Sequence, residues 1–344
     1  MIRADIKSLA AYHVQDSRGM VKLDAMENPF PLPEKLRTEW TKRLGELDVN
    51  RYPDADMLAL RTKIAALDGL KPEQVLIGNG SDEIIQMLLM AADNGPCLVP
   101  EPTFVMYSLI SRWLKRPVSS IPLDKDFNLT ADKWLEIAAR EKAAIAFFAC
   151  PNNPTGNMWP IEEIRRIANH FKGLIVIDEA YLPFADQTHT SLIAPNVVVL
   201  RTFSKLGWAG LRFGYLLGDA KTIAELNKVR LPYNINSLTQ TAVDFLLDHM
   251  RDFTKQATMI RKERERMAQK LAGMEGIEVF PSQANFLLIR LNQAPEIFEA
   301  LKAKNILIKN MDSSHALLKN CLRVTIGSKE ENNSFLAAIK EIRA

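Results

Sequence analysis

Lys205 lies in a segment whose residue types could support chemistry at a carbonyl group. The segment 201–212 follows an apolar run at 197–200. Around Lys205 it carries two hydroxyls, two glycines and a nearby arginine, at Thr202, Ser204, Gly207, Gly210 and Arg212. A lysine in a loop is usually a solvated charge, but burial and neighbouring cations lower the pKa of an amine and make it nucleophilic. Hydroxyls and an arginine also suit a phosphate dianion, so the segment predicts a reactive amine beside a phosphate site.

Asp178 ends another apolar run, 174–177, and Tyr181 follows it three residues later. An acid at the end of a strand can simply cap a turn or a helix. A carboxylate in a low-dielectric site can instead keep a partner base protonated. A pyridine nitrogen is such a base, and its protonation turns the ring into an electron sink. Asp178 is therefore a candidate partner for a ring cofactor.

Two loops add further polar groups. The stretch 78–83 (Gly-Asn-Gly-Ser-Asp-Glu) precedes an apolar helix with Ser81 expected as its N-cap, and the free N–H groups of a helix start favour phosphate. It matches neither the P-loop nor the dinucleotide-binding fingerprint. The stretch 151–156 (Pro-Asn-Asn-Pro-Thr-Gly) predicts a tight turn that would hold the side chain of Asn153 rigidly.

The elements that must position these residues alternate along the chain. The expected strands are 97–99, 143–149, 174–177, 197–200 and 214–217, and the expected helices are 82–92, 104–115, 131–140 and 161–170. Strands that are apolar throughout and separated by helices predict an α/β fold, with a mainly parallel sheet covered on both faces. Ligands bind at the carboxyl ends of such strands, which is where the polar residues lie.

The pattern changes after this region. A helical stretch at 237–271 leads into strands at 278–280 and 286–290, a helix, strands near 306–308 and 322–326, and a last helix. This order predicts a smaller α+β domain. We expect a Pro-rich N-terminal arm at 1–34 that packs with the small domain, a large cofactor-binding domain at 35–250 and the small domain at 251–344.

Composition excludes several classes of protein. A net charge of +3 without a long basic run argues against nucleic acid as a partner. The three cysteines, Cys97, Cys150 and Cys321, are too far apart for a disulfide framework or a metal site. The sequence has neither a secretory signal at its start nor an apolar run long enough to span a membrane. A cytoplasmic protein is expected.

The order and spacing of Asn153-Pro154-Thr155-Gly156, Asp178 with Tyr181, Ser204-Lys205 and Arg212 resemble the fold-type I pyridoxal-phosphate (PLP) aminotransferases over nearly the whole chain. Within that superfamily the sequence is most similar to the histidinol-phosphate aminotransferase family. The stretches that carry this similarity are 24–29, 50–54, 102–104, 201–205, 209–212 and 321–327.

The resemblance implies a role for each matching residue. Lys205 would carry PLP as a Schiff base and move a proton, and Asp178 would pair with the ring nitrogen. Asn153 and Tyr181 would hydrogen-bond the ring hydroxyl, and Phe104 would stack on the ring. The cofactor phosphate would be bound by the backbone at Ser81 and Asp82, by Thr202, Ser204 and Arg212, and by Tyr52 from the partner subunit.

The resemblance also implies a substrate site and an assembly. Arg323 would bind the anionic group of the substrate, which is a phosphate in the histidinol-phosphate enzymes, although a structural ion pair is the alternative. Tyr12 and Asn28 would line the substrate pocket from the arm. Because Tyr52 would serve the partner's site, a homodimer with shared sites is expected.

The implied reaction is transamination between histidinol phosphate and 2-oxoglutarate, giving imidazole-acetol phosphate and glutamate in histidine biosynthesis. The alternatives are an aromatic amino-acid aminotransferase, a PLP-dependent decarboxylase of a phosphorylated amino acid and, from another class, a PLP-binding regulator. Two departures from the family pattern stand out. Phe104 replaces a frequent Tyr, and the segment from Lys205 to Arg212 is one residue shorter than in many relatives.

Overall fold

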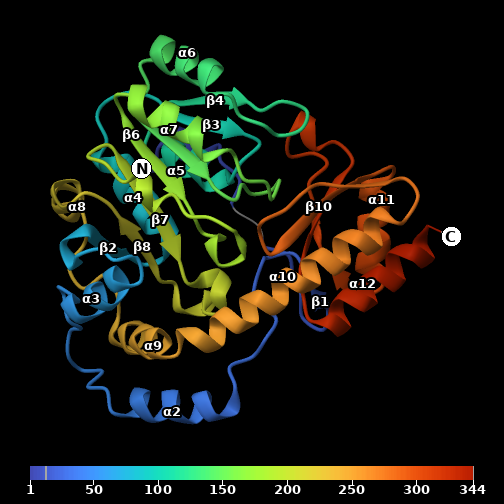
Figure 1. Ribbon diagram of the computed structural model, residues 1–344, viewed down its shortest axis with the longest axis horizontal. Helices are drawn as coiled ribbons and strands as arrows, with labels where there is room; N and C mark the ends of the chain where they lie inside the picture. The colour runs from blue at the N-terminus through green and yellow to red at the C-terminus, as the bar shows by residue number, and fades with distance from the viewer. Residues whose placement is uncertain (12–13, 344) are drawn as a thin grey trace.

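The structure is a computed structural model that describes residues 1–11 and 14–343. Figure 1 shows a larger α/β part and a smaller part beside it, with the long helix α10 (Met250–Ala272) running between them. The larger part is a mainly parallel sheet with helices on both faces, which confirms the predicted α/β fold class.

A seven-stranded sheet lies at the centre of the larger part, in the order β2-β8-β7-β6-β5-β3-β4. Its strands are β2 (Val75–Gly78), β3 (Cys97–Glu101), β4 (Val118–Pro122), β5 (Ile145–Ala149), β6 (Leu174–Asp178), β7 (Val197–Thr202) and β8 (Gly214–Leu217). β8 is antiparallel to both of its neighbours, and the remaining pairs are parallel. All five expected strands are present, whereas β2 and β4 were not expected from the sequence.

Helices cover both faces of this sheet. Because successive side chains of a strand point to opposite faces, Phe147 of β5 packs in one hydrophobic core and Phe148 in the other. α4 (Gly80–Ala91), α5 (Val105–Trp113) and α8 (Ala220–Asn227) contribute to the core of Phe147. α3 (Leu58–Ala66), α6 (Ala131–Glu141), α7 (Ile161–His170) and α9 (Ser237–Asp248) contribute to the core of Phe148, and α2 (Glu34–Gly45) lies against α9 (Figure 1).

The smaller part contains an antiparallel sheet in the order β12-β13-β10-β9. Its elements are β9 (Ile277–Val279), β10 (Phe286–Leu291), α11 (Ala294–Ala303), β12 (Lys309–Asn310), β13 (Cys321–Thr325) and α12 (Lys329–Ile342). The side chain of Ser328 and that of Glu331 form a capping box at the start of α12. The strand expected near 306–308 is β11 (Ile306–Leu307), and β12 follows after Ile308.

The expectation of one helical stretch over 237–271 was wrong, because the chain leaves the helix at His249, where φ is −116° and ψ is 18°. α9 ends before this residue and α10 begins after it. Phe245 of α9 and Phe253 of α10 both pack edge-on against Trp208, at ring distances of 6.3 and 5.3 Å. Because both helices pack on the Trp208 indole, the apolar pattern of the sequence continues across the break. The change of direction between α9 and α10 therefore cannot be seen in the sequence pattern.

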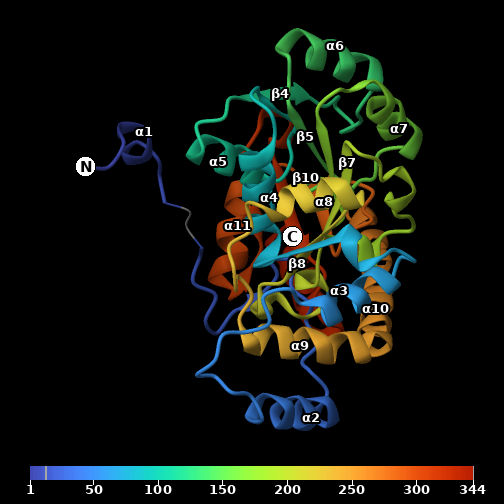
Figure 2. The same cartoon turned by 90° about the vertical axis from the view of Figure 1, so that its left-hand side faces the viewer.

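The N-terminal segment reaches the smaller part. β1 (Val21–Lys22) pairs in parallel with β11, and the backbone N–H of Leu23 donates to the carbonyl of Leu307 at 2.7 Å. Further along, the N–H of Met26 donates to Oγ1 of Thr325 at 3.0 Å. α1 (Ala4–Lys7) stands away from the body of the molecule, as Figure 2 shows. The expected contact between the arm and the small part is thus present, and the domain limits stay a prediction.

Short 3-10 helices occur at η1 (Pro72–Gln74), η2 (Leu182–Phe184), η3 (Thr190–Leu192), η4 (Ser204–Leu206), η5 (Ala209–Leu211) and η6 (Ala316–Leu318). No helix within residues 1–11 and 14–343 is long and apolar enough to cross a membrane. The same residues hold no cluster of His, Cys, Asp or Glu that could bind a metal ion.

Candidate active site

A cavity of about 380 Å³ lies at the carboxyl ends of β5, β6 and β7, and its size falls in the range of small-molecule sites. The structure brings most of the sequence-predicted site residues to its walls, namely Ser81, Asp82, Phe104, Asn153, Asp178, Tyr181, Thr202, Ser204, Lys205 and Arg212. They come from five segments of the chain, so the sheet edge gathers them as expected for a parallel α/β fold.

Lys205 lies in η4, directly after β7. Burial lowers the pKa of its amine to about 8, and the positive charge of Arg323 acts in the same direction. Its Nζ lies 5.6 Å from the centre of the Tyr181 ring. A buried amine with this pKa is partly neutral near physiological pH, which is the state that attacks a carbonyl or accepts a proton.

Asp178 is the last residue of β6 and is 4% exposed. Its Oδ1 accepts a hydrogen bond from the backbone N–H of Ala180 at 2.9 Å, and its Oδ2 accepts one from the hydroxyl of Tyr107 at 2.6 Å. Burial raises the pKa of the carboxyl to about 6, and the hydrogen bond from Tyr107 opposes this rise. The carboxylate faces the cavity, so it is placed to pair with a cationic group there.

Asn153 and Tyr181 form a second polar pair at the cavity. Nδ2 of Asn153 donates to the Tyr181 hydroxyl at 3.1 Å, and Oδ1 of Asn153 accepts from Nη1 of Arg323 at 2.6 Å. Nη2 of Arg323 donates to the carbonyl of Asp24 at 2.8 Å. Arg323 therefore lies behind Asn153, joined to the cavity through this amide, and it also contacts the arm.

The start of α4 faces the cavity with free backbone donors. The prediction that Ser81 is the N-cap was wrong, because the helix begins at Gly80 and Ser81 already belongs to its first turn. The side chain of Asn79, at the N-cap position, makes no cap hydrogen bond within the described chain, and the backbone N–H of Asn79 donates to Glu83 Oε2 at 2.5 Å. The N–H groups of the first turn have no partner inside a helix, so they remain available to an anion.

Arg212 and two hydroxyls face these donors. Arg212 adopts a left-handed backbone conformation with φ of 50°, and its Nη2 lies 3.3 Å from Oδ2 of Asp82. Oγ1 of Thr202 lies 2.9 Å from Oγ of Ser204. Gly80 permits this arrangement, because a Cβ there would lie 2.8 Å from the guanidinium of Arg212. The group has the donors and the positive charge that a phosphate requires.

The remaining predicted residues lie in different places. Phe104 lines the cavity and its ring meets that of Tyr107 edge-on at 5.4 Å. Tyr52 lies away from the cavity, 81% exposed and stacked on Tyr233 at 4.5 Å. Asn28 does not line the cavity either, since its Nδ2 donates to the carbonyl of Leu206 at 3.2 Å and to Gln256 at 2.9 Å. Tyr12 lies outside the described residues.

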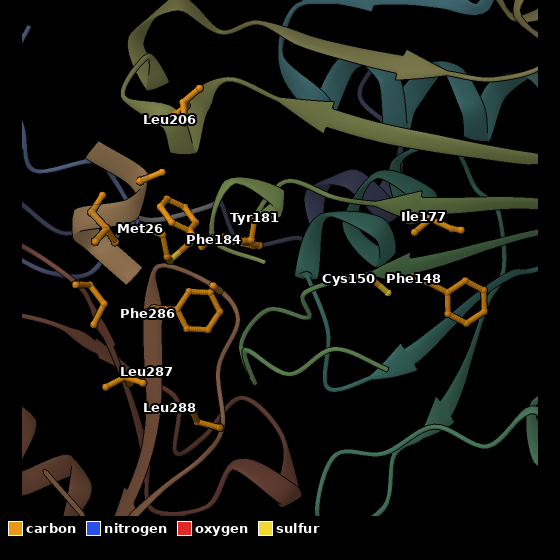
Figure 3. Close-up of a cluster of buried hydrophobic side chains, with 14 of the residues drawn as sticks. Met26, Phe148, Cys150, Ile177, Tyr181, Phe184, Leu206, Phe286, Leu287 and Leu288 are labelled. Atoms are coloured by element: carbon orange, nitrogen blue, oxygen red, sulfur yellow. The ribbon is translucent and has the colours of Figure 1, made fainter. Parts of the chain in front are cut away.

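Sequence reasoning missed Tyr107 and the part of the arm that covers the cavity, Ala25, Met26 and Glu27. Figure 3 shows Met26 in the buried cluster with Tyr181 and Phe286, where the two parts of the fold meet. Tyr107 carried no motif, because a tyrosine on the apolar face of a helix is usually a core residue. Met26 lies in the stretch 24–29, which indicated the family resemblance but no role for this side chain.

Comparisons with known proteins agree with this geometry. The family model "Aminotransferase class I and II" matches residues 18–339. Histidinol-phosphate aminotransferase 2 of Cupriavidus pinatubonensis is 44% identical over 98% of this chain and 95% of its own length, and histidinol-phosphate aminotransferase 1 of Burkholderia lata is 46% identical over 99% and 97%. The crystal structure of the Sinorhizobium meliloti histidinol-phosphate aminotransferase in complex with pyridoxal-5'-phosphate superposes with a TM-score of 0.89, at 22% identity, over 99% of this chain and 98% of that one.

Fold and site together thus define an aminotransferase of class I and II. Among these enzymes the chain belongs to the histidinol-phosphate aminotransferase family, as the identities above 40% over nearly its full length demonstrate. This assignment confirms the predicted PLP-dependent transamination and the predicted enzyme class.

Proposed function

We propose that this protein transfers the amino group between histidinol phosphate and 2-oxoglutarate, as a cytoplasmic homodimer with two shared active sites. The observation that carries the proposal is the buried Lys205 amine in one cavity with Asp178 and a set of phosphate donors. The relatives above 40% identity are named for histidinol phosphate, so neither the aromatic substrate nor the decarboxylase is favoured.

The residues of the cavity fit PLP. The buried carboxylate of Asp178 suits the ring nitrogen, and the amide of Asn153 with the hydroxyl of Tyr181 suits the ring hydroxyl. The first turn of α4 and Arg212 suit the phosphate. When bound, PLP supplies a carbonyl that takes up the amino group and a ring that withdraws electrons from the substrate.

The protein's own groups then orient the substrate and move its proton. Nζ of Lys205, with a pKa of about 8, can accept a proton from the substrate carbon and return it to a neighbouring atom. Asn153 fixes the Tyr181 hydroxyl by donating to it, and Arg323 in turn fixes Asn153. Met26 lines the cavity with an apolar side chain that is 9% exposed, so it can help to exclude water from this region.

The test of the substrate is a half-reaction without a keto acid. Protein loaded with PLP is mixed with histidinol phosphate or with phenylalanine, and the loss of the visible absorbance of the cofactor is followed. Histidinol phosphate is expected to bleach the absorbance at a far lower concentration than phenylalanine. An equal or better response to phenylalanine would transfer the proposal to an aromatic aminotransferase.

We propose that Arg323 also binds the phosphate of histidinol phosphate. Arg323→Gln is then expected to raise the KM for this substrate about 10–100-fold, because a hydrogen-bonded pair of charges contributes about 1.5–3 kcal/mol. The effect on kcat is expected to be smaller, since the phosphate of the substrate does not change during the reaction. The matched control is Arg290→Gln on β10, whose guanidinium pairs with Glu278 at 2.8 Å outside the cavity. Equal KM values in the two variants would remove Arg323 from the substrate site.

Tyr52 is proposed to reach the cofactor phosphate of the partner. Its exposed ring stacks on the exposed ring of Tyr233, and exposed apolar surface of this kind is often covered by another subunit. Dimers formed from Tyr52→Ala and Lys205→Ala chains are therefore expected to contain one intact site each.

At limiting PLP, an equal mixture of the two variants should recover up to about a quarter of wild-type activity, because half of the random dimers are mixed. Each variant alone serves as the control. If Tyr52 acted within its own subunit, every site of the mixed dimer would carry one defect and the mixture would show no gain.

A further inference from the structure

Tyr107 has a buried hydroxyl that points at the acid of the active site. The residue lies in the first turn of α5, and its side chain is fully buried. The hydroxyl donates to Oδ2 of Asp178 at 2.6 Å, a distance typical of hydrogen bonds from O–H groups to charged oxygens. The partner lies 71 positions further along the chain, so this contact depends on the packing of α5 against the sheet.

The ring of Tyr107 cannot move freely. It is stacked on Phe147 of β5, with ring centres 4.6 Å apart and planes at 14°. The edge-on contact with Phe104 restrains it further, at 5.4 Å. The hydroxyl is therefore held at a defined place by the core. Phe104 is the N-cap of α5 and Tyr107 lies in its first turn, so one helix start brings both a ring for stacking and a donor to the site.

The two oxygens of Asp178 are each held by one donor. The backbone N–H of Ala180 binds Oδ1 and the Tyr107 hydroxyl binds Oδ2. An aspartate side chain otherwise rotates broadly about its last torsion, so these two bonds set the plane of the carboxylate. We propose that Tyr107 is a positioning residue that orients the Asp178 carboxylate toward the ring nitrogen of PLP. The inference rests on the assignment of Asp178 to that nitrogen made above.

The hydrogen bond also favours the ionised acid. A donor to the carboxylate stabilises its charged form, so the contact from Tyr107 lowers the pKa of Asp178 against the rise that burial causes. The other titratable groups that act on Asp178 or respond to it are Asp82 of α4, Lys205 of η4, Cys150 after β5 and Tyr181 after β6. Loss of the hydroxyl should therefore leave Asp178 protonated up to a higher pH.

The test is Tyr107→Phe, measured by titrating the protein with PLP at a series of pH values and following the visible absorbance. The dissociation constant is expected to rise about tenfold, which corresponds to about 1.4 kcal/mol. Affinity should fall as the pH is lowered through the pKa of Asp178, since the protonated acid cannot pair with a cationic ring. This fall is expected at a higher pH in Tyr107→Phe than in wild type.

Tyr215→Phe is the matched control. Tyr215 lies in β8 of the same sheet, is 5% exposed, and its hydroxyl interacts with the positive charge of Arg201 outside the cofactor cavity. The Tyr215→Phe variant should lose stability to a degree similar to Tyr107→Phe. Its affinity for PLP and the pH dependence of that affinity should be unchanged. If Tyr107→Phe behaved in the same way as this control, Tyr107 would be a core residue and the proposal would be overturned.

Asp178→Asn separates this inference from the site assignment on which it depends. In the Asn background, Tyr107→Phe is expected to have little further effect on PLP affinity, because the two residues act as one unit. Additive effects would overturn the role of Tyr107 alone. If Asp178→Asn left PLP affinity unchanged, the assignment of Asp178 to the ring nitrogen would fail first.

Discussion

Lys205→Ala is expected to lower the rate of transamination about 10⁴-fold, the upper end of what one positioned acid–base group contributes. The loss should be this large because one amine has two tasks, holding the cofactor and moving a proton. The amine lies in the half-buried wall of the cavity, where desolvation lowers its pKa to about 8, so the wild-type protein provides the neutral amine near physiological pH. The measurement is the initial rate with histidinol phosphate and 2-oxoglutarate.

The variant should still fold, since removing a buried amine removes a desolvation cost. Lys205→Arg is the matched control, because it keeps the positive charge but cannot lose its proton in a protein. It is expected to be as inactive as the alanine variant. Borohydride should fix the cofactor to the wild-type protein and to neither variant. Activity of Lys205→Arg within tenfold of wild type would show that charge, and not a titrating amine, is what the site requires.

Asp178→Asn is expected to lower kcat about 10³-fold. A pair of opposite charges about 4 Å apart at an effective dielectric constant of about 20 contributes about 4 kcal/mol, which corresponds to about three orders of magnitude in rate. An amide keeps the shape of the side chain but cannot hold a proton on the ring nitrogen. The rate of the half-reaction with histidinol phosphate measures the loss, and Asp178→Glu should recover part of it.

The melting temperature of Asp178→Asn shows whether the loss of kcat comes from the site or from misfolding. Burial raises the folded-state pKa of Asp178 from its ordinary 3.8 to about 6, so the folded protein binds the proton more tightly than the unfolded chain does. Stability from this group therefore falls as the pH rises from about 4 to about 6, and it stays reduced above that range. At pH 7 the unliganded Asn variant should melt no lower than wild type. A marked drop in melting temperature would point to a structural role for the carboxylate.

Much of this site could be predicted from the sequence, because several polar site residues directly follow apolar runs that predict strands. Asp178 and Thr202 each end a strand that opens with four apolar residues, and the parallel arrangement of those strands brings their ends to one edge. The resemblance to a known family then assigned the roles. β2 and β4, the two edge strands of the sheet, were not predicted. β4 lacks a continuous apolar run, and only its Ile121 is buried. β2 is buried throughout, but its apolar run is only three residues long and leads directly into Gly78.

The remaining features depend on packing between distant segments. The hydrogen bond from Tyr107 to Asp178 needs the exact distance between α5 and β6, which no spacing in the sequence encodes. The start of α4 was placed two residues late because Ser81 suits an N-cap, whereas the helix begins at Gly80 and Glu83 accepts the N–H of Asn79 in the structure. The break at His249 follows from the shared contact of two helices with Trp208.

The wall that the arm contributes has a consequence for the order in which the protein folds during synthesis. Met26 is held by Thr325, 299 positions away along the chain. At about 5–20 residues per second, the ribosome needs roughly 15–60 s to make the chain between these two residues. Through that interval the large sheet and Lys205 emerge while the arm still lacks the strand it pairs with. The arm can therefore cover the cofactor cavity only near the end of translation. Before that point PLP meets an open site.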